Sequence, residues 1–382
     1  MTTVNDLHPQ AMDLADEAFR LRRRGNDAEA RMLFLRALEL EQKAAFLLPA
    51  TEASEPSRSI LYRSAASLAY NAEDYEEAER LIAFGLSGFP PPEIRDELKN
   101  LYENINFMHH LKVQGITLSK NQWIMTIYGN ATSFGGTLVE PLMHRVEKIT
   151  TLFYRTVERL LGIEYRASGS TKKEIKDAYG LYVNAFAPSS FAVSFQIGAP
   201  DLQTPLFPDW EKKKPIEPDS VIDEVMKCFE ILENEEEDEL RERIHDETYY
   251  ENFVGIAKQI APDGNDIKFV GFKSLVGEEE RQVALRKSRE QLRNTFHITE
   301  IAEEEGVTKE TYRGVLKFAS SPISRNYGTV KLMETATGES HTIKVPIALM
   351  KDVVQPYYEE RVSIIAFRKR NTLYLDEISP ES

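Results

Sequence analysis

The spacing of apolar residues divides this chain into parts with different periods. In the first part, apolar side chains recur every three to four positions between Gly and Pro breaks, which predicts amphipathic helices. Further on, helical stretches are mixed with short segments that alternate apolar and polar residues, and the last part consists mainly of such segments. We therefore predict a multidomain α and β protein with a helical domain at 1–112, an α+β domain at 113–297 and a small β-barrel at 298–382.

Two segments of the first domain share one spacing of small and apolar residues. In both segments these residues stand at −16, −12, −9, +4 and +7 from a central alanine, which is Ala30 in the first and Ala78 in the second. Ala18 and Ala66 occupy the position at which two helices must approach closely. This pattern resembles the tetratricopeptide repeat over roughly residues 11–105.

The resemblance implies a stack of helix pairs whose concave surface binds a protein partner. The face formed by the first helix of each pair would carry Phe19, Arg22, Arg63, Ser67 and Tyr70. The two central alanines are 48 residues apart instead of about 34, and two repeats are fewer than the three usually needed for stability. We therefore expect residues 92–112 to form a capping helix and residues 1–112 not to fold alone.

The middle domain shows a mixture of both periods, and we identify no family for it. Its predicted elements are a hairpin around 119–122, a long helix at 138–160 ending at Gly162, two strands within 178–198, helices at 218–244 and 247–261, and strands at 267–275 and 281–288. The segment GNATSFGG (129–136) precedes the long helix but lacks the lysine of a P-loop, so we interpret it as a connection.

Residues 296–318 allow two interpretations. In a helix-turn-helix, Ala302 would be the close-contact residue and Gly306 the turn. However, residues 298–318 carry five acidic side chains, and Gly314 would cost ~1 kcal/mol inside a recognition helix. Five short segments rich in β-branched and aromatic residues, the first containing residues 312–318, are separated by turn signals. We therefore favour a strand, in which Tyr312, Gly314, Leu316 and Phe318 face the interior of a barrel of the OB or SH3-like type.

Composition sets further limits. The 382-residue chain is 42% hydrophobic and 29% charged. Its formal net charge of −15 argues against a protein whose whole surface binds nucleic acid or acidic lipid. The only cysteine, Cys228, lies at helical spacing among apolar residues, so we expect it in the core. The start of the chain lacks the pattern of a signal peptide, and we expect a cytoplasmic protein with no membrane segment.

The sequence contains no recognisable catalytic motif. The seven histidines do not form a zinc-peptidase pattern, and His109 and His110 point to different faces of a helix. We therefore assign no catalytic residue, no metal ligand and no cofactor, and expect the protein not to be an enzyme. A metal-dependent nuclease hidden among the loop aspartates Asp201, Asp209, Asp263 and Asp266 stays open as an alternative.

The sequence thus favours a non-catalytic adaptor or regulatory subunit with a protein partner in a bacterial-type multi-protein system. The alternative is a nucleic-acid-binding effector, or a component of a defence or toxin–antitoxin type system, that uses the barrel. The segment 312–382 supports it, because it holds ten Lys or Arg against eight Asp or Glu in an otherwise acidic chain. The basic residues Arg368, Lys369 and Arg370 would then contact nucleic acid. The oligomeric state is left open.

Overall fold

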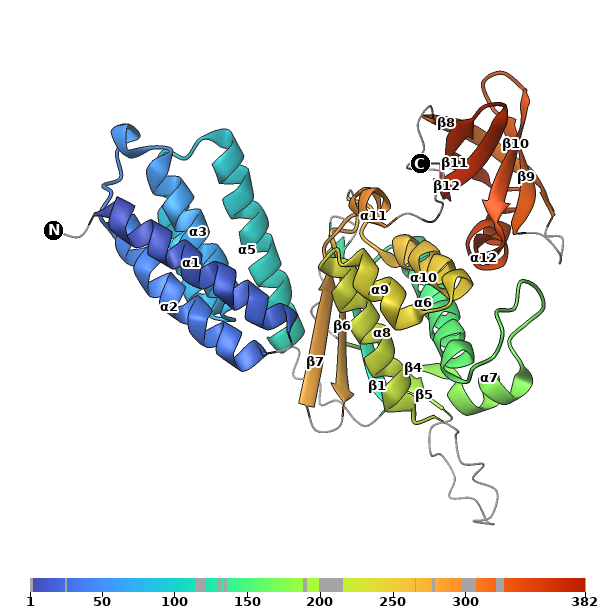
Figure 1. Ribbon diagram of the computed structural model, residues 1–382, viewed down its shortest axis with the longest axis horizontal. Coiled ribbons are helices and arrows are strands. Elements are labelled where there is room, and N and C mark those ends of the chain that lie inside the picture. The colour runs from blue at the N-terminus through green and yellow to red at the C-terminus, as the bar shows by residue number, and fades with distance from the viewer. Residues whose placement is uncertain are drawn as a thin grey trace, which may run out of the picture. The chain divides into compact units, whose positions relative to one another are not determined.

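The protein is described by a computed structural model (Figure 1) that divides into two compact units, Met1–Val113 and Gln114–Ser382. The structure describes residues 3–24, 26–113, 121–129, 132–133, 136–187, 191–198, 216–264, 266–276, 279–296, 298, 307–320 and 326–381. The architecture is mixed α and β, with helices in the first unit and sheets together with helices in the second.

The first unit consists of helices. They are α1 (Val4–Arg23), α2 (Asp27–Phe46), the 3-10 turn η1 (Glu52–Ser54), α3 (Ser57–Asn71), α4 (Tyr75–Leu86) and α5 (Pro92–Val113). Asp74 stabilises the start of α4, because its side chain accepts a hydrogen bond from the backbone N–H of Glu77. Small residues allow the helices to approach closely: a Cβ at Gly85 of α4 would lie 2.9 Å from the Leu98 side chain of α5.

This unit has a hydrophobic core of its own. Ala18 and Ala66, at which helices were expected to approach closely, are completely buried, and so are the two central alanines Ala30 and Ala78. Phe34 is the largest fully buried side chain of the cluster, in which side chains from all five α-helices take part.

The second unit contains an antiparallel sheet. Its strands are β1 (Gln122–Tyr128), β4 (Leu181–Ala187), β5 (Phe191–Ile197), β6 (Phe269–Val276) and β7 (Glu279–Leu285), in the spatial order β4-β5-β1-β6-β7. The predicted strand pairs within 178–198 and 267–288 are confirmed. The first strand of the predicted hairpin around 119–122 lies outside the described residues. The short strands β2 (Thr132–Ser133) and β3 (Gly136–Thr137) pair with each other.

The sheet is accompanied by helices that pack against one another and against its strands. They are α6 (Val139–Leu160), α7 (Lys173–Tyr179), α8 (Pro218–Glu233), α9 (Glu237–Ile244), α10 (Glu247–Ile260) and α11 (Arg289–Thr295). Trp123 of β1 is buried against Phe153 of α6 and stacks on Phe272, which in turn stacks on Phe229 of α8. The long helix at 138–160 is confirmed, and Gly162 follows it with φ +66°.

The predicted helix at 218–244 was wrong in one respect. The chain leaves the helical path after Glu233, and Glu235 adopts φ +62° before α9 begins. The apolar period continues across this point, since Leu232 and Leu240 are both buried. Periodicity alone therefore hid the break, and two helices replace one.

The last strands close into a barrel. They are β8 (Thr308–Ser320), β9 (Tyr327–Glu334), β10 (Ser340–Pro346), β11 (Arg361–Lys369) and β12 (Thr372–Pro380), in the order β10-β12-β11-β8-β9. All neighbours are antiparallel except β10 and β12, which are parallel. A helical segment joins β10 to β11: α12 (Ile347–Leu349), the π-helical turn η4 (Met350–Val354) and the 3-10 turn η5 (Gln355–Tyr357).

Strand β8 decides between the two interpretations of residues 296–318. The segment 312–318 is a strand paired with β9 and β11, so it is not a recognition helix. Ala302 and Gly306 lie outside the described residues. Tyr312, Gly314 and Leu316 face the barrel interior as predicted. Phe318 does not: a register shift after Leu316 turns it outward, and it is 43% exposed.

Candidate functional site

The predicted partner-binding residues of the helical unit come from two helices. Phe19 and Arg22 belong to α1, and Arg63, Ser67 and Tyr70 to α3. Arg22 is held within the unit: its guanidinium donates to the side chain and the carbonyl oxygen of Asn71, at 2.8 and 2.6 Å, and lies over the Phe34 ring. Burial lowers the pKa of Arg22 from its ordinary value, which fits a guanidinium used to join α1 and α3.

The other predicted residues also have intramolecular contacts. Arg63 forms an ion pair with Glu97 of α5 at 2.8 Å, and the Tyr70 ring packs at 5.7 Å from that of Tyr75. The carbonyl oxygen of Ser67 accepts a hydrogen bond from the Asn71 side chain. Phe19 is 40% exposed and packs edge-on against Phe34. Most of this set therefore contributes to the packing of the helices as well as to their surface.

A recess lies between the first turns of α1 and α3, which the sequence reasoning did not single out. It has a volume of about 380 Å³, and its lining includes Val4, His8, Pro9, Ile60 and Leu61. His8 Nδ1 is 2.9 Å from the carboxylate of Glu41, which is completely buried in α2. The recess thus combines apolar residues with the polar side chains of Asn5, His8 and Ser57, and the His8 ring is held by Glu41.

The barrel presents a second surface on the outer face of β8, β9, β10 and β12, here called the β9–β10 face. It consists of Phe318, Tyr327, Lys331, Lys344 and Tyr374. Phe318 of β8 and Lys331 of the neighbouring β9 are directly opposite each other, and the Lys331 ammonium lies 5.6 Å from the centre of the Phe318 ring. Tyr327 packs edge-on against Tyr374 at 5.6 Å, and Lys344 is paired with Tyr374 in the register. Aromatic rings and lysines therefore share this face.

The predicted basic cluster lies at the turn between β11 and β12. Arg368 donates to both carboxylate oxygens of Glu310 at 2.6 and 2.8 Å and to the hydroxyl of Tyr312 at 2.6 Å. Its charge is therefore matched within the barrel. Arg370 is exposed in the turn with φ +54°, and Lys369 precedes it at the end of β11.

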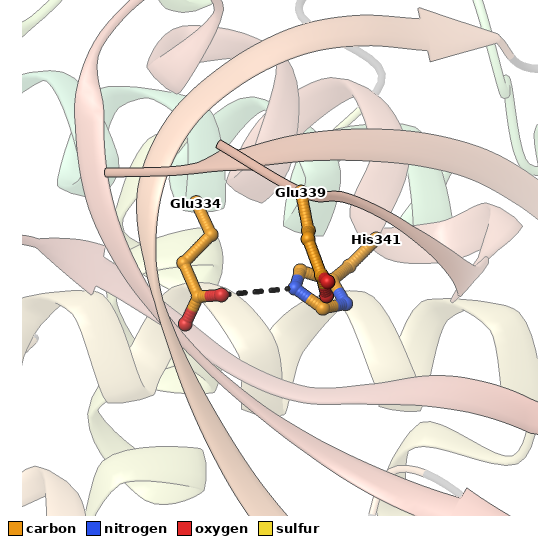
Figure 2. A group of neighbouring side chains, drawn as sticks. All are labelled: Glu334, Glu339 and His341. Atoms are coloured by element: carbon orange, nitrogen blue, oxygen red, sulfur yellow. Dashed lines mark hydrogen bonds and ion pairs between the residues drawn. The ribbon is translucent and has the colours of Figure 1, made fainter. Parts of the chain in front are cut away.

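A third group occupies one end of the barrel, here called the barrel mouth: Glu310, Tyr312, Glu334, His341 and Arg368. These residues stand at inward-facing strand positions. Figure 2 shows Glu334, His341 and the nearby Glu339 with their polar ends directed toward one another. Glu334 Oε2 is 3.3 Å from His341 Nε2, and the ligand atoms of the three residues all lie within 4.8 Å of one another.

Sequence reasoning missed this group, because Glu334 and His341 come from different strands. The signal that could have found it is their position on either side of the TATGES turn, which makes them neighbours once a hairpin forms. Of the aspartates considered as nuclease ligands, Asp263 accepts hydrogen bonds from the backbone N–H groups of Asp266 and Ile267. Asp201 and Asp209, and the side chains of His109 and His110, lie outside the described part of the chain.

Cys228 is buried in the core as expected. Burial raises the pKa of its thiol to about 12, which makes it unreactive at neutral pH. Among the described helices, we find none that combines the length and apolar character required to cross a bilayer. Comparisons with protein-family models, with curated proteins and with solved structures gave no match.

Proposed function

We propose that this protein is a non-catalytic adaptor or regulatory subunit that binds a protein partner through its N-terminal helical unit. On this proposal it acts in the cytoplasm as part of a bacterial-type multi-protein system. The observation that carries the proposal is the recess between α1 and α3, which are the first helices of the two helix pairs. In tetratricopeptide repeats, which these pairs resemble in spacing, stacked helix pairs create concave binding surfaces.

The chemistry of the recess supports a peptide or protein ligand. Val4, Pro9 and Ile60 offer apolar contact, and the imidazole of His8 contributes a polar group to the lining. A volume of about 380 Å³ is large enough for one or two side chains of a partner. Because Arg22 and Arg63 already have partners within the unit, we expect the recess rather than these two residues to carry the affinity.

The test is copurification of the full-length chain from its native host. We expect a stoichiometric protein partner with the parent chain and its loss with Ile60→Asp, since a carboxylate in the recess would have to be desolvated on binding. Met32→Asp is the matched control, because Met32 lies on α2 outside the recess and is 62% exposed. Absence of any partner from the parent would contradict the adaptor proposal, whereas retention in both variants would contradict only the recess.

A second candidate function is binding of single-stranded nucleic acid by the barrel. We infer an OB-type barrel, because β11, β8, β9 and β10 have the 4-1-2-3 order of a Greek key when β8 is counted first. In OB folds the second and third strands bind oligonucleotides, and here these are β9 and β10. The favouring observation is that Phe318, Tyr327 and Tyr374 share the β9–β10 face with Lys331 and Lys344, since such binding combines stacking with phosphate contacts.

This candidate is tested with a fluorescent oligo-dT at low and at ~150 mM salt. We expect salt-sensitive binding that Lys331→Glu with Lys344→Glu abolishes. Arg313→Glu with Arg361→Glu is the matched control, because both arginines are exposed on β8 and β11 and the charge change is equal. Equal effects of the two double variants would assign the binding to overall charge and reject the β9–β10 face.

A further inference from the structure

The inward positions of the barrel change from apolar to polar at its mouth. Along β9 the inward residues are Gly328, Val330 and Leu332, and then Glu334. At the opposite end, a Cβ at Gly328 would lie 2.7 Å from Met350 of the helical segment, so that end is covered. On β10 the inward sequence is Val345, Ile343 and then His341. Glu334 and His341 thus occupy inward positions at which apolar side chains would fill a barrel core, which points to a role other than core packing.

The hairpin between β9 and β10 adds a second carboxylate. The backbone N–H of Glu334 donates to the carbonyl oxygen of Glu339 at 2.9 Å, which fixes the two residues on opposite sides of the turn. As Figure 2 shows, the Glu339 side chain then extends toward the imidazole of His341. One imidazole nitrogen and two carboxylates therefore offer ligand atoms that all lie within 4.8 Å of one another.

The spacing fits metal coordination. Zinc binds His nitrogen and carboxylate oxygen at about 2.0–2.2 Å with tetrahedral angles, so two ligand atoms of one site lie roughly 3.3–3.5 Å apart. His341 Nε2 and Glu334 Oε2 are separated by 3.3 Å. Glu339 is exposed, so a change of rotamer can bring its carboxylate within coordinating distance of an ion held by His341 and Glu334.

Neighbouring groups hold two of these ligands in place. The His341 ring lies 4.4 Å from the ring of Tyr312, whose hydroxyl accepts a hydrogen bond from Arg368. The hydroxyl of Thr337 donates a hydrogen bond to Glu334 Oε2, which restrains the position of this carboxylate.

We propose that Glu334, Glu339 and His341 bind one divalent transition-metal ion of the zinc type at the barrel mouth. His341 Nε2 and one oxygen from each glutamate are the protein ligands, and water completes the coordination. Zinc accepts this mixed nitrogen and oxygen set, whereas Mg²⁺ and Ca²⁺ prefer oxygen ligands alone. The two carboxylates neutralise the ion, so no additional anion is required.

The experiment is calorimetric titration of the chelator-treated full-length chain with ZnCl2. We expect one saturable equivalent in the parent and at least a tenfold lower affinity in both Glu339→Gln and His341→Gln, since even supporting groups of metal sites contribute 10–100-fold. His245→Gln with Glu242→Gln, which changes the same residue types at exposed positions, should leave the affinity unchanged. MgCl2 should bind much more weakly than ZnCl2.

A thermal melt of the metal-free variants checks the fold, and Glu339→Gln is the safer change because this side chain is exposed. Zinc should raise the melting temperature of the parent and the control but not that of either site variant. Lack of one saturable equivalent in the parent would overturn the proposal. Zinc binding that persists unchanged in both site variants would overturn it equally, since the ion would then be adventitious and bound elsewhere.

Discussion

Arg155 of α6 and Asp352 of the helical segment form a buried ion pair at 2.7 Å, although they are 197 positions apart in the sequence. Asn252 of α10 donates to the same carboxylate at 3.1 Å, and Lys148 donates to the carbonyl oxygen of Asp352 at 2.6 Å. Arg155 also donates to Glu158. This network joins the barrel to the sheet-and-helix part, and a continuous hydrophobic core accompanies it. The two parts therefore belong to one compact unit.

The first prediction concerns this ion pair. Asp352→Ala leaves Arg155 buried with only one carboxylate partner, so we expect the free energy of unfolding to fall by about 3 kcal/mol. Urea unfolding followed by tryptophan fluorescence measures it, because both tryptophans belong to the second unit. Glu360→Ala, at an exposed position, should change stability by less than about 0.5 kcal/mol. If the two variants unfold alike, the pair does not hold the unit together.

The second prediction is a dependence on pH. Burial, with Glu247 nearby, raises the pKa of Glu251 from its ordinary 4.5 to about 7. The folded chain then keeps a proton that the unfolded chain releases, so this group lowers stability as pH rises from about 4.5 to 7. Glu251→Gln should be more stable than the parent by roughly 2 kcal/mol at pH 8 and by much less at pH 5. The exposed Glu242→Gln should show no such change between the two pH values, and a pH-independent gain at Glu251 would contradict the prediction.

The third prediction concerns Gly314 in β8. A Cβ at this position would lie 2.0 Å from the carbonyl oxygen of Met333, and a backbone atom cannot move aside as a flexible side chain can. Gly314→Ala should therefore separate β8 from β9 and cost roughly 2 kcal/mol or more, measured by chemical unfolding. Thr311→Ala on the same strand is exposed and serves as the control. A fully stable Gly314→Ala variant would show that the two strands can adjust.

The fourth prediction revises an expectation about the helical unit. Two repeats alone suggested that residues 1–112 do not fold, but the core of the first unit includes Leu98 and Ile105 of α5 and is fully formed by residues of that unit. We now predict that residues 1–113 fold alone and unfold in one cooperative thermal transition. Far-UV circular dichroism measures it. A gradual loss of helix on heating would contradict this prediction and would indicate that two repeats are too few for a stable fold.

Local pattern was sufficient for much of this fold. The period of apolar residues located α6 and the strands β4 to β7, and it identified Cys228 as a core residue. Alternation in 312–318, together with the acidic charge of the preceding residues, was enough to favour a strand over a recognition helix. These features depend on residues within a few positions of each other, so they can be predicted from the sequence.

Local pattern failed where distant segments decide the outcome. Alternation predicted Phe318 inside the barrel, but the bulge that pairing with β9 introduces after Leu316 turns it outward. The pattern also gave no sign that the close approach of α1 and α3 brings Arg22, a predicted partner-binding residue, to Asn71.

The candidate sites depend on tertiary structure in the same way. Glu334 and His341 become neighbours only through the β9–β10 register, and Arg155 meets Asp352 only when the barrel packs on α6 and α10. Residue patterns along the chain therefore predict most helices and strands and their apolar faces, apart from the break after Glu233. They do not predict which charged and aromatic side chains meet, because strand register and helix contacts are fixed by packing among segments far apart in the chain.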